Sequence, residues 1–107
     1  MPNSILVVDD KANVRSLIQD YLSEQGFRVL TACNGREALF VARQEKPDLI
    51  LLDIPVMDGL SAIEILKTKE DTKSIPIIVL TSFAMAGDKE RVFLAEADDF
   101  FNKANKN

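Results

Sequence analysis

The stretch Ile5-Leu6-Val7-Val8-Asp9-Asp10 decides how the chain folds, because four consecutive apolar residues are followed at once by two carboxylates. A short, unbroken apolar run predicts a strand that is buried on both faces, as in a parallel sheet. Two similar runs follow at residues 49–52 and 77–80, and weaker candidates lie at 28–31 and 99–101. The sequence therefore predicts five strands.

Helical patterns separate these runs. Apolar residues recur with helical spacing from Val14 to Leu22, and a fourth helix is expected over residues 88–95. The start and stop signals are Gly26 after the first helix, Asn34 with Glu37 as a capping box before the second, and Asp58 as the cap of the third. Strands that alternate with helices predict an α/β fold, a doubly wound parallel sheet with right-handed crossovers and helices on both faces.

The composition restricts the classes of function that the chain can have. The 107 residues are 47% hydrophobic and 28% charged, which suits one globular domain with a real core. A net charge of −4 disfavours direct nucleic-acid binding, and no apolar run is long enough for a membrane span. The lone Cys33 excludes an internal disulfide and favours the cytoplasm. Without a histidine, the chain has no imidazole for acid–base chemistry or metal binding.

Polar residues follow the predicted strands where each strand ends, namely Asp9, Asp10, Asp53, Thr81 and Lys103. In a parallel sheet these side chains converge on one crevice at the carboxyl edge. Three crowded carboxylates repel one another unless a cation offsets their charge, and oxygen ligands of this kind suit Mg²⁺. The ammonium of Lys103 and the hydroxyl of Thr81 would fit a phosphoryl group carried on one carboxylate.

Each of these residues also has an ordinary structural explanation. Considered without the others, Asp10 would be a helix N-cap, Thr81 a turn residue and Lys103 a solvated lysine. Asp53 is harder to explain in this way, since it closes a buried apolar run, where an unpartnered charge is expensive. The joint pattern at the ends of four strands favours a functional acidic pocket.

With these residues in view, the chain resembles the receiver domain of two-component response regulators, of the stand-alone, single-domain type. Four motifs carry the resemblance: residues 5–10, the run Pro47–Asp53, the run Ile75–Thr81 and the run Ala97–Lys103. It extends over essentially the whole chain and implies one receiver domain over residues 1–107. The implied fold is flavodoxin-like, with strand order 2-1-3-4-5.

The resemblance also implies a role for each matching residue. Asp53 would be the nucleophile that accepts a phosphoryl group, and Mg²⁺ would be the cofactor. Asp10 and Asp53 would bind Mg²⁺ directly, and Asp9 would help through water. A backbone carbonyl two residues past the nucleophile, here Pro55 by counting, would complete the metal contacts. The other implied roles are Lys103 on the phosphoryl oxygens, Thr81 as the hydroxyl that moves to the phosphate, and Phe100 as the switch aromatic.

The resemblance further implies the partners. Because the chain has no histidine, the phosphoryl donor would be a separate histidine kinase or histidine phosphotransfer protein. A downstream protein target would read the altered conformation, with no direct nucleic-acid or membrane binding. Such a protein is a switch and not an ordinary enzyme, although it can catalyse its own phosphorylation and dephosphorylation.

Three features depart from the family pattern. The segment Asp53-Ile54-Pro55-Val56-Met57-Asp58-Gly59 is two residues shorter than usual, and aligning its Pro-Val-Met-Asp-Gly part puts the metal-binding carbonyl in the gap. Lys103 is followed by Ala104 in place of the usual proline. The chain stops at Asn107, before the family's last helix.

The missing last helix has a consequence for the surface. We expect bare apolar surface on the first, third and fifth strands and on the flank of the first helix, and therefore self-association. An incomplete domain is the other explanation of the short chain.

Two other functions compete with the phosphoryl-accepting switch. A degenerate or truncated receiver would keep the fold and bind a partner without phosphorylation. An Mg²⁺-dependent phosphatase with an aspartyl nucleophile would need a second acid two residues after Asp53, where Pro55 stands.

Overall fold

The computed structural model describes residues 3–53, 56–81 and 99–102. Strands and helices alternate as the sequence predicts, up to the fourth strand. In chain order the elements are β1 (Ser4–Asp9), α1 (Ala12–Glu24), β2 (Arg28–Ala32), α2 (Gly35–Glu45), β3 (Leu49–Asp53), α3 (Val56–Thr68), β4 (Ile77–Thr81) and β5 (Asp99–Asn102). The helix expected over residues 88–95 lies outside the described residues.

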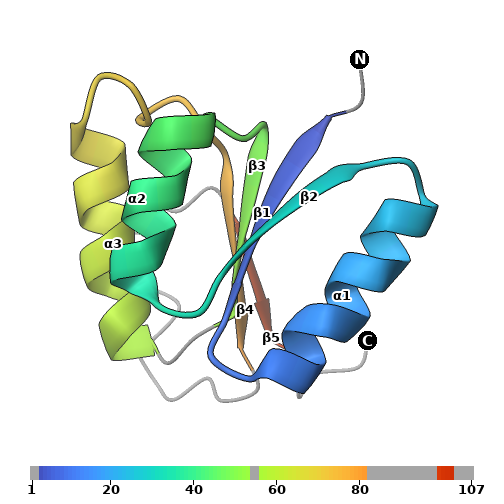
Figure 1. Ribbon diagram of the computed structural model, residues 1–107. Helices are drawn as coiled ribbons and strands as arrows, with labels where there is room; N and C mark the ends of the chain where they lie inside the picture. Colours follow the sequence, from blue (N-terminus) through green and yellow to red (C-terminus); the bar gives the residue numbers. More distant parts are fainter. Residues whose placement is uncertain (1–2, 54–55, 82–98, 103–107) are drawn as a thin grey trace.

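The five strands form one parallel sheet in the order β2-β1-β3-β4-β5. This confirms the doubly wound α/β prediction and the strand order. Helix α1 lies on one face, and α2 and α3 lie side by side on the other (Figure 1). Among the described residues, no helix is both long enough and apolar enough to cross a membrane.

The main core lies between the sheet and the pair α2–α3. Every second residue of the central strands faces this side, and their side chains are almost completely buried. Alternation of this kind is what a pleated strand with one fully covered face requires. The largest members of this core are Leu6, Ile50, Leu52, Ile63, Leu66 and Ile77.

The opposite face is covered unevenly. Helix α1 packs against β1 and β2, so Ile5 and Val7 of β1 are buried. The expectation of bare surface on the first strand is therefore wrong, since its residues on this face are buried and α1 packs against it. On β3, however, the residues of this face are only half-buried, and Leu17 and Tyr21 on α1 are exposed.

A clamp at the amino ends of β1 and β3 fixes how these strands pair. The Ser4 backbone N–H donates to Asp48 Oδ2 at 2.7 Å, and the Asp48 N–H donates to the Ser4 carbonyl at 2.8 Å. The register that follows runs from Ile5 opposite Leu49 to Asp9 opposite Asp53. A slip of one residue would turn every side chain to the wrong face.

Local signals set the helix ends. The Asn34 side chain accepts from the Glu37 N–H at 2.8 Å, which confirms the predicted cap of α2. The Cys33 N–H in turn donates to Glu37 Oε1 at 3.2 Å, one residue earlier than the donor of the usual capping box. After α1, Gly26 adopts a φ of 96°, a left-handed conformation that glycine takes without steric cost.

The predicted start of the third helix, at Gly59 after an Asp58 cap, is wrong by three residues. Helix α3 begins at Val56, so Asp58 lies inside its first turn and is not its cap. Acidic residues are favoured both at the cap and in the first turn of a helix, so an acidic residue in the sequence does not by itself separate the two positions.

Replacing Asn34 tests its assignment as the N-cap of α2. Asn34→Ala removes the acceptor of the Glu37 N–H, so we expect the free energy of unfolding to fall by about 1 kcal/mol. Urea unfolding provides the measurement. Gln44→Ala, at an exposed position of the same helix, is the control and should change stability by less than about 0.5 kcal/mol. Equal stabilities for the two variants would contradict the assigned cap.

Candidate functional site

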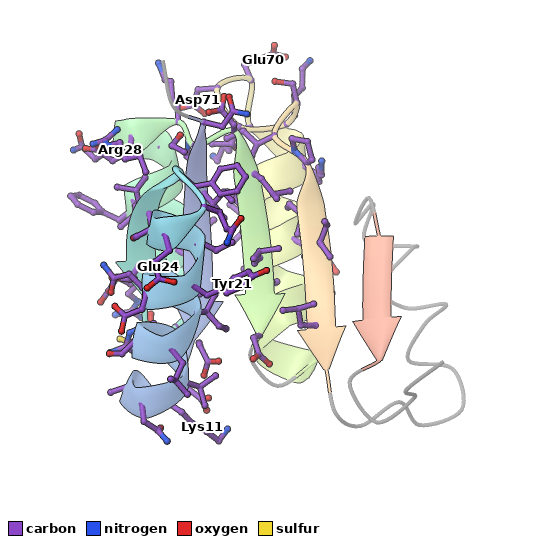
Figure 2. The ribbon with its side chains drawn as sticks, turned by 90° about the vertical axis from the view of Figure 1, so that its right-hand side faces the viewer. Lys11, Tyr21, Glu24, Arg28, Glu70 and Asp71 are labelled. Atoms are coloured by element: carbon purple, nitrogen blue, oxygen red, sulfur yellow. The ribbon has the colours of Figure 1, made fainter. Side chains whose placement is uncertain are left out.

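The candidate site lies at the carboxyl edge of the sheet. Asp9 and Asp53 are the last residues of β1 and β3, and the parallel register places them directly opposite each other. In Figure 2 the arrowheads of the strands point to the end of the molecule at which Lys11 lies. Open parallel sheets bind their ligands at this edge.

Asp9 is a buried carboxylate with only part of its hydrogen-bonding capacity used. Its side chain is among the fully buried ones, with 1% of the residue exposed. Oδ1 accepts from the Lys11 backbone N–H at 2.8 Å. Oδ2 is also buried and has no donor among the described residues. A buried carboxylate oxygen without a hydrogen-bond partner destabilises the fold, so a proton or a cation bound at this atom would be stabilising.

The surroundings of Asp9 raise its pKa from 3.8 to about 6. Burial is the largest cause, because it disfavours the charged form. The second cause is the neighbouring Asp53 carboxyl. The two groups can form a hydrogen bond only when one of them is protonated, so this bond favours the protonated form of Asp9. The charges of Asp53 and Asp10 raise the pKa further, and the bond from Lys11 opposes the rise.

Asp10 lies at the rim of the site. Its side chain is 47% exposed, and Oδ1 is 3.3 Å from Nζ of Lys11. Exposed ion pairs of this kind contribute little stability, so this contact does not fix the carboxylate in place. The N-cap of α1 is Lys11, so the reading of Asp10 as a helix cap is wrong.

Arg15 is a part of the site that the sequence analysis missed. Its Nη1 donates to the backbone carbonyl of Asp9 at 2.7 Å, and the residue is half-buried. A fixed guanidinium next to the end of β1 orients the backbone that carries the acidic pair. The spacing held a signal, because Arg15 lies one helical turn after Lys11 and so on the same side of α1.

The other predicted site residues are described less fully. Thr81 is the last residue of β4 and pairs with Asn102 of β5, and Phe100 pairs with Val79. Thr81 therefore lies at the same edge of the sheet as Asp9 and Asp53. Lys103 and Pro55 lie outside the described residues. Within the described ranges, no group of three or more acidic or cysteine side chains is arranged to hold a metal ion.

This arrangement can support one kind of chemistry. Two carboxylates that lie side by side, one of them buried, attract a proton or a hard cation. Oxygen-only donors without histidine or cysteine suit Mg²⁺, which keeps several waters and shares phosphate oxygens. A carboxylate next to such a cation can act as a nucleophile toward a phosphoryl group.

Sequence comparison decides the family. Residues 5–107 match the sequence profile of the response regulator receiver domain. The chain belongs to the response regulator receiver domain family. A curated relative, the polar-differentiation response regulator DivK of Brucella anthropi, is 37% identical to this receiver domain over 105 residues, which cover 96% of this chain and 85% of DivK.

Solved structures agree with this receiver fold. The chemotaxis response regulator CheY4 of Vibrio cholerae superposes with a TM-score of 0.88 at 29% identity, covering 99% of this chain and 90% of CheY4. The receiver domain of the sensor histidine kinase PA1611 from Pseudomonas aeruginosa gives a TM-score of 0.85 at 33% identity, covering 99% of this chain and 88% of that domain. In the PA1611 structure a magnesium ion is coordinated in the active-site cleft.

The raised pKa of Asp9 predicts how the stability of this receiver domain depends on pH. The unfolded chain loses its Asp9 proton near pH 3.8 and the folded chain near pH 6, so the folded state binds more protons between these values. Metal-free stability should then fall as the pH rises from about 4 to about 7, by about 3 kcal/mol for this group.

The variant Asp9→Asn isolates this effect, because asparagine resembles the protonated acid. In EDTA, we expect the variant to match the wild type at pH 4 and to be more stable at pH 7, as measured by urea unfolding across the range. Asp20→Asn, at an exposed position of α1, is the control and should show no such trend. A difference between Asp9→Asn and wild type that stays constant with pH would contradict the burial of an ionisable Asp9.

Proposed function

We propose that this receiver domain is a phosphoryl-accepting signalling switch, in which Asp53 takes a phosphoryl group from a partner phosphohistidine with the help of Mg²⁺. The observation that carries the proposal is the register of β1 and β3, which holds Asp53 beside the buried Asp9 at the ligand-binding edge of the sheet. Membership of the receiver family supports the same reading.

The donor set fits a magnesium ion. Asp9 has a buried oxygen without a donor and a raised pKa, as expected where a carboxylate is built to face a cation. In the proposal, Asp10 and Asp53 bind Mg²⁺ directly, Asp9 acts through water, and the carbonyl of Pro55 is the candidate backbone ligand. The bound ion would neutralise charge on the phosphoryl oxygens.

Asp53 supplies the nucleophile. One of its carboxylate oxygens attacks phosphorus, the phosphorus–nitrogen bond breaks, and the electron pair returns to the imidazole nitrogen of the donor. The chain has no histidine, so the donor is a histidine kinase or a histidine phosphotransfer protein. Arg15 holds the backbone of Asp9 and so keeps the neighbouring carboxylates in place.

The remaining residues respond to the new group. Lys103 is proposed to contact the phosphoryl oxygens, Thr81 to donate a hydrogen bond to them, and Phe100 to turn inward behind Thr81. Thr81 ends β4 at the same edge as Asp53, which is the position this role needs. A downstream protein would read the change, in the cytoplasm, where the kinase presents its phosphohistidine.

Phosphorylation by a small donor tests the proposal. The chain is incubated with acetyl phosphate and Mg²⁺, and its intact mass is measured. We expect one phosphoryl group to be added to the wild type and none to Asp53→Asn, and EDTA should suppress the reaction because the metal is needed. Asp20→Asn, on the exposed side of α1, is the matched control and should react like the wild type.

Two results would overturn the assignment of Asp53. One is a mass shift that persists in Asp53→Asn, and the other is a folded wild type that gains no phosphoryl group. The second result would favour the competing function, a receiver that binds its partner without phosphorylation, for which the shortened segment 53–59 is the sequence support.

A further inference from the structure

Helix α1 begins with a residue that the usual preferences for helix starts disfavour. Lys11 is its N-cap, a position at which serine, threonine, aspartate and asparagine are preferred because their short side chains accept a backbone N–H. The Lys11 side chain makes no such bond, and the first turn of α1 contains no acidic residue. A positive charge at this end also opposes the helix dipole. The helix itself therefore gives no reason for a lysine at this position.

The acidic edge of the sheet, formed by Asp9, Asp10 and Asp53, offers a reason. The Lys11 backbone N–H donates to Asp9 Oδ1 at 2.8 Å, and Lys11 Nζ lies 3.3 Å from Asp10 Oδ1. One residue thus contacts two of the carboxylates, one through its backbone and the other through its ammonium. Because only the second contact needs the side chain, a substitution at Lys11 removes the ammonium and keeps the backbone bond to Asp9.

We propose that the Lys11 ammonium is a tethered counter-ion of the acidic edge, which pairs with Asp10 in the metal-free chain and weakens the binding of Mg²⁺. The inference rests on the proposed function, in which Asp10 binds the ion directly. A cation bound to Asp10 approaches an ammonium that already contacts this carboxylate, and the two positive charges repel each other. Lys11 would then set the magnesium concentration at which this receiver can accept a phosphoryl group.

The exposure of the ion pair limits the size of the effect. The Lys11 and Asp10 side chains are 69% and 47% exposed, so water screens their contact and either group can turn away. Lys11 directly follows Asp10 in the chain, however, so the ammonium stays near one Debye length, about 10 Å at 0.1 M salt. We therefore expect Lys11 to weaken Mg²⁺ binding by about three- to tenfold at low salt, and by less when added NaCl screens the repulsion.

Arg15, the other cation near the start of α1, differs from Lys11 in this respect. Its Nη1 donates to the backbone carbonyl of Asp9 at 2.7 Å, and the residue is half-buried. A guanidinium held on a carbonyl does not occupy a carboxylate oxygen that a metal ion would use. We therefore expect Arg15 to keep its contact when the ion binds and Lys11 to give up its own.

Titration of the full chain with MgCl₂ tests the proposal, by isothermal calorimetry at low and at moderate NaCl. Lys11→Met removes the ammonium and keeps a long side chain. It should bind Mg²⁺ about three- to tenfold more tightly than the wild type at low salt, with a smaller difference at moderate salt. Lys11→Arg keeps a positive charge and should bind like the wild type. The position is exposed, so the fold should tolerate both changes, and circular dichroism checks this.

Lys69→Met is the matched control, because it changes the net charge by the same amount at another exposed position. Lys69 precedes Glu70, which lies at the opposite end of the molecule from Lys11 (Figure 2). This variant should bind Mg²⁺ like the wild type. Equal affinities of Lys11→Met and the wild type would overturn the proposal. An equal gain in affinity in Lys69→Met or in Lys11→Arg would also overturn it, since the position or the charge would then not be the cause.

The phosphorylation assay separates this inference from the proposed function. If Lys11→Met and the wild type bind Mg²⁺ equally and Asp53 still gains a phosphoryl group from acetyl phosphate, only the role of Lys11 is overturned. If neither chain binds Mg²⁺, the metal site of the proposed function is overturned, and the role of Lys11 with it.

Discussion

This site depends on the parallel register of β1 and β3, which places two carboxylates side by side. Asp9 and Asp53 oppose each other because β1 and β3 are pinned at their other ends by Ser4 and Asp48. Electrostatics alone would drive the two groups apart, so the packing of the central strands maintains their contact. The destabilising charge is concentrated at the one edge of the sheet where a ligand can relieve it, and fold and site are coupled through this pair of strands.

The two faces of the sheet contribute differently to stability. The α2–α3 side has a closed core in which side chains such as Leu52, Ile63 and Leu66 are buried. Each such side chain stabilises the fold by about 1.5–3 kcal/mol. On the other side, α1 packs against β1 and β2, and the half-buried residues of β3 and β4 gain less. A small domain with a total stability of about 5–15 kcal/mol is sensitive to such a difference.

Much of the fold could be predicted, because its signals are local or follow from topology. Short apolar runs located the strands, and a contact three residues apart located the cap of α2. The meeting of Asp9 and Asp53 followed from parallel strands alone. The spacing from Lys11 shows on which side of α1 Arg15 lies, but its contact with the Asp9 carbonyl was not predictable, because it depends on how α1 is oriented against the sheet. The same orientation buries Ile5 and Val7, on a strand for which the missing last helix had led us to expect bare surface.

The Ser4–Asp48 clamp also has a consequence for how the chain reaches its native state. Its two residues are 44 positions apart, and all of α1, β2 and α2 lies between them. Closing so long a segment costs chain entropy before any contact repays it. Parallel strands cannot pair through a tight hairpin, so the central pair of the sheet must form after, or together with, the intervening elements. The acidic edge then forms no earlier than these elements, and we expect the folding rate to depend on such non-local pairings more than on the speed of helix formation.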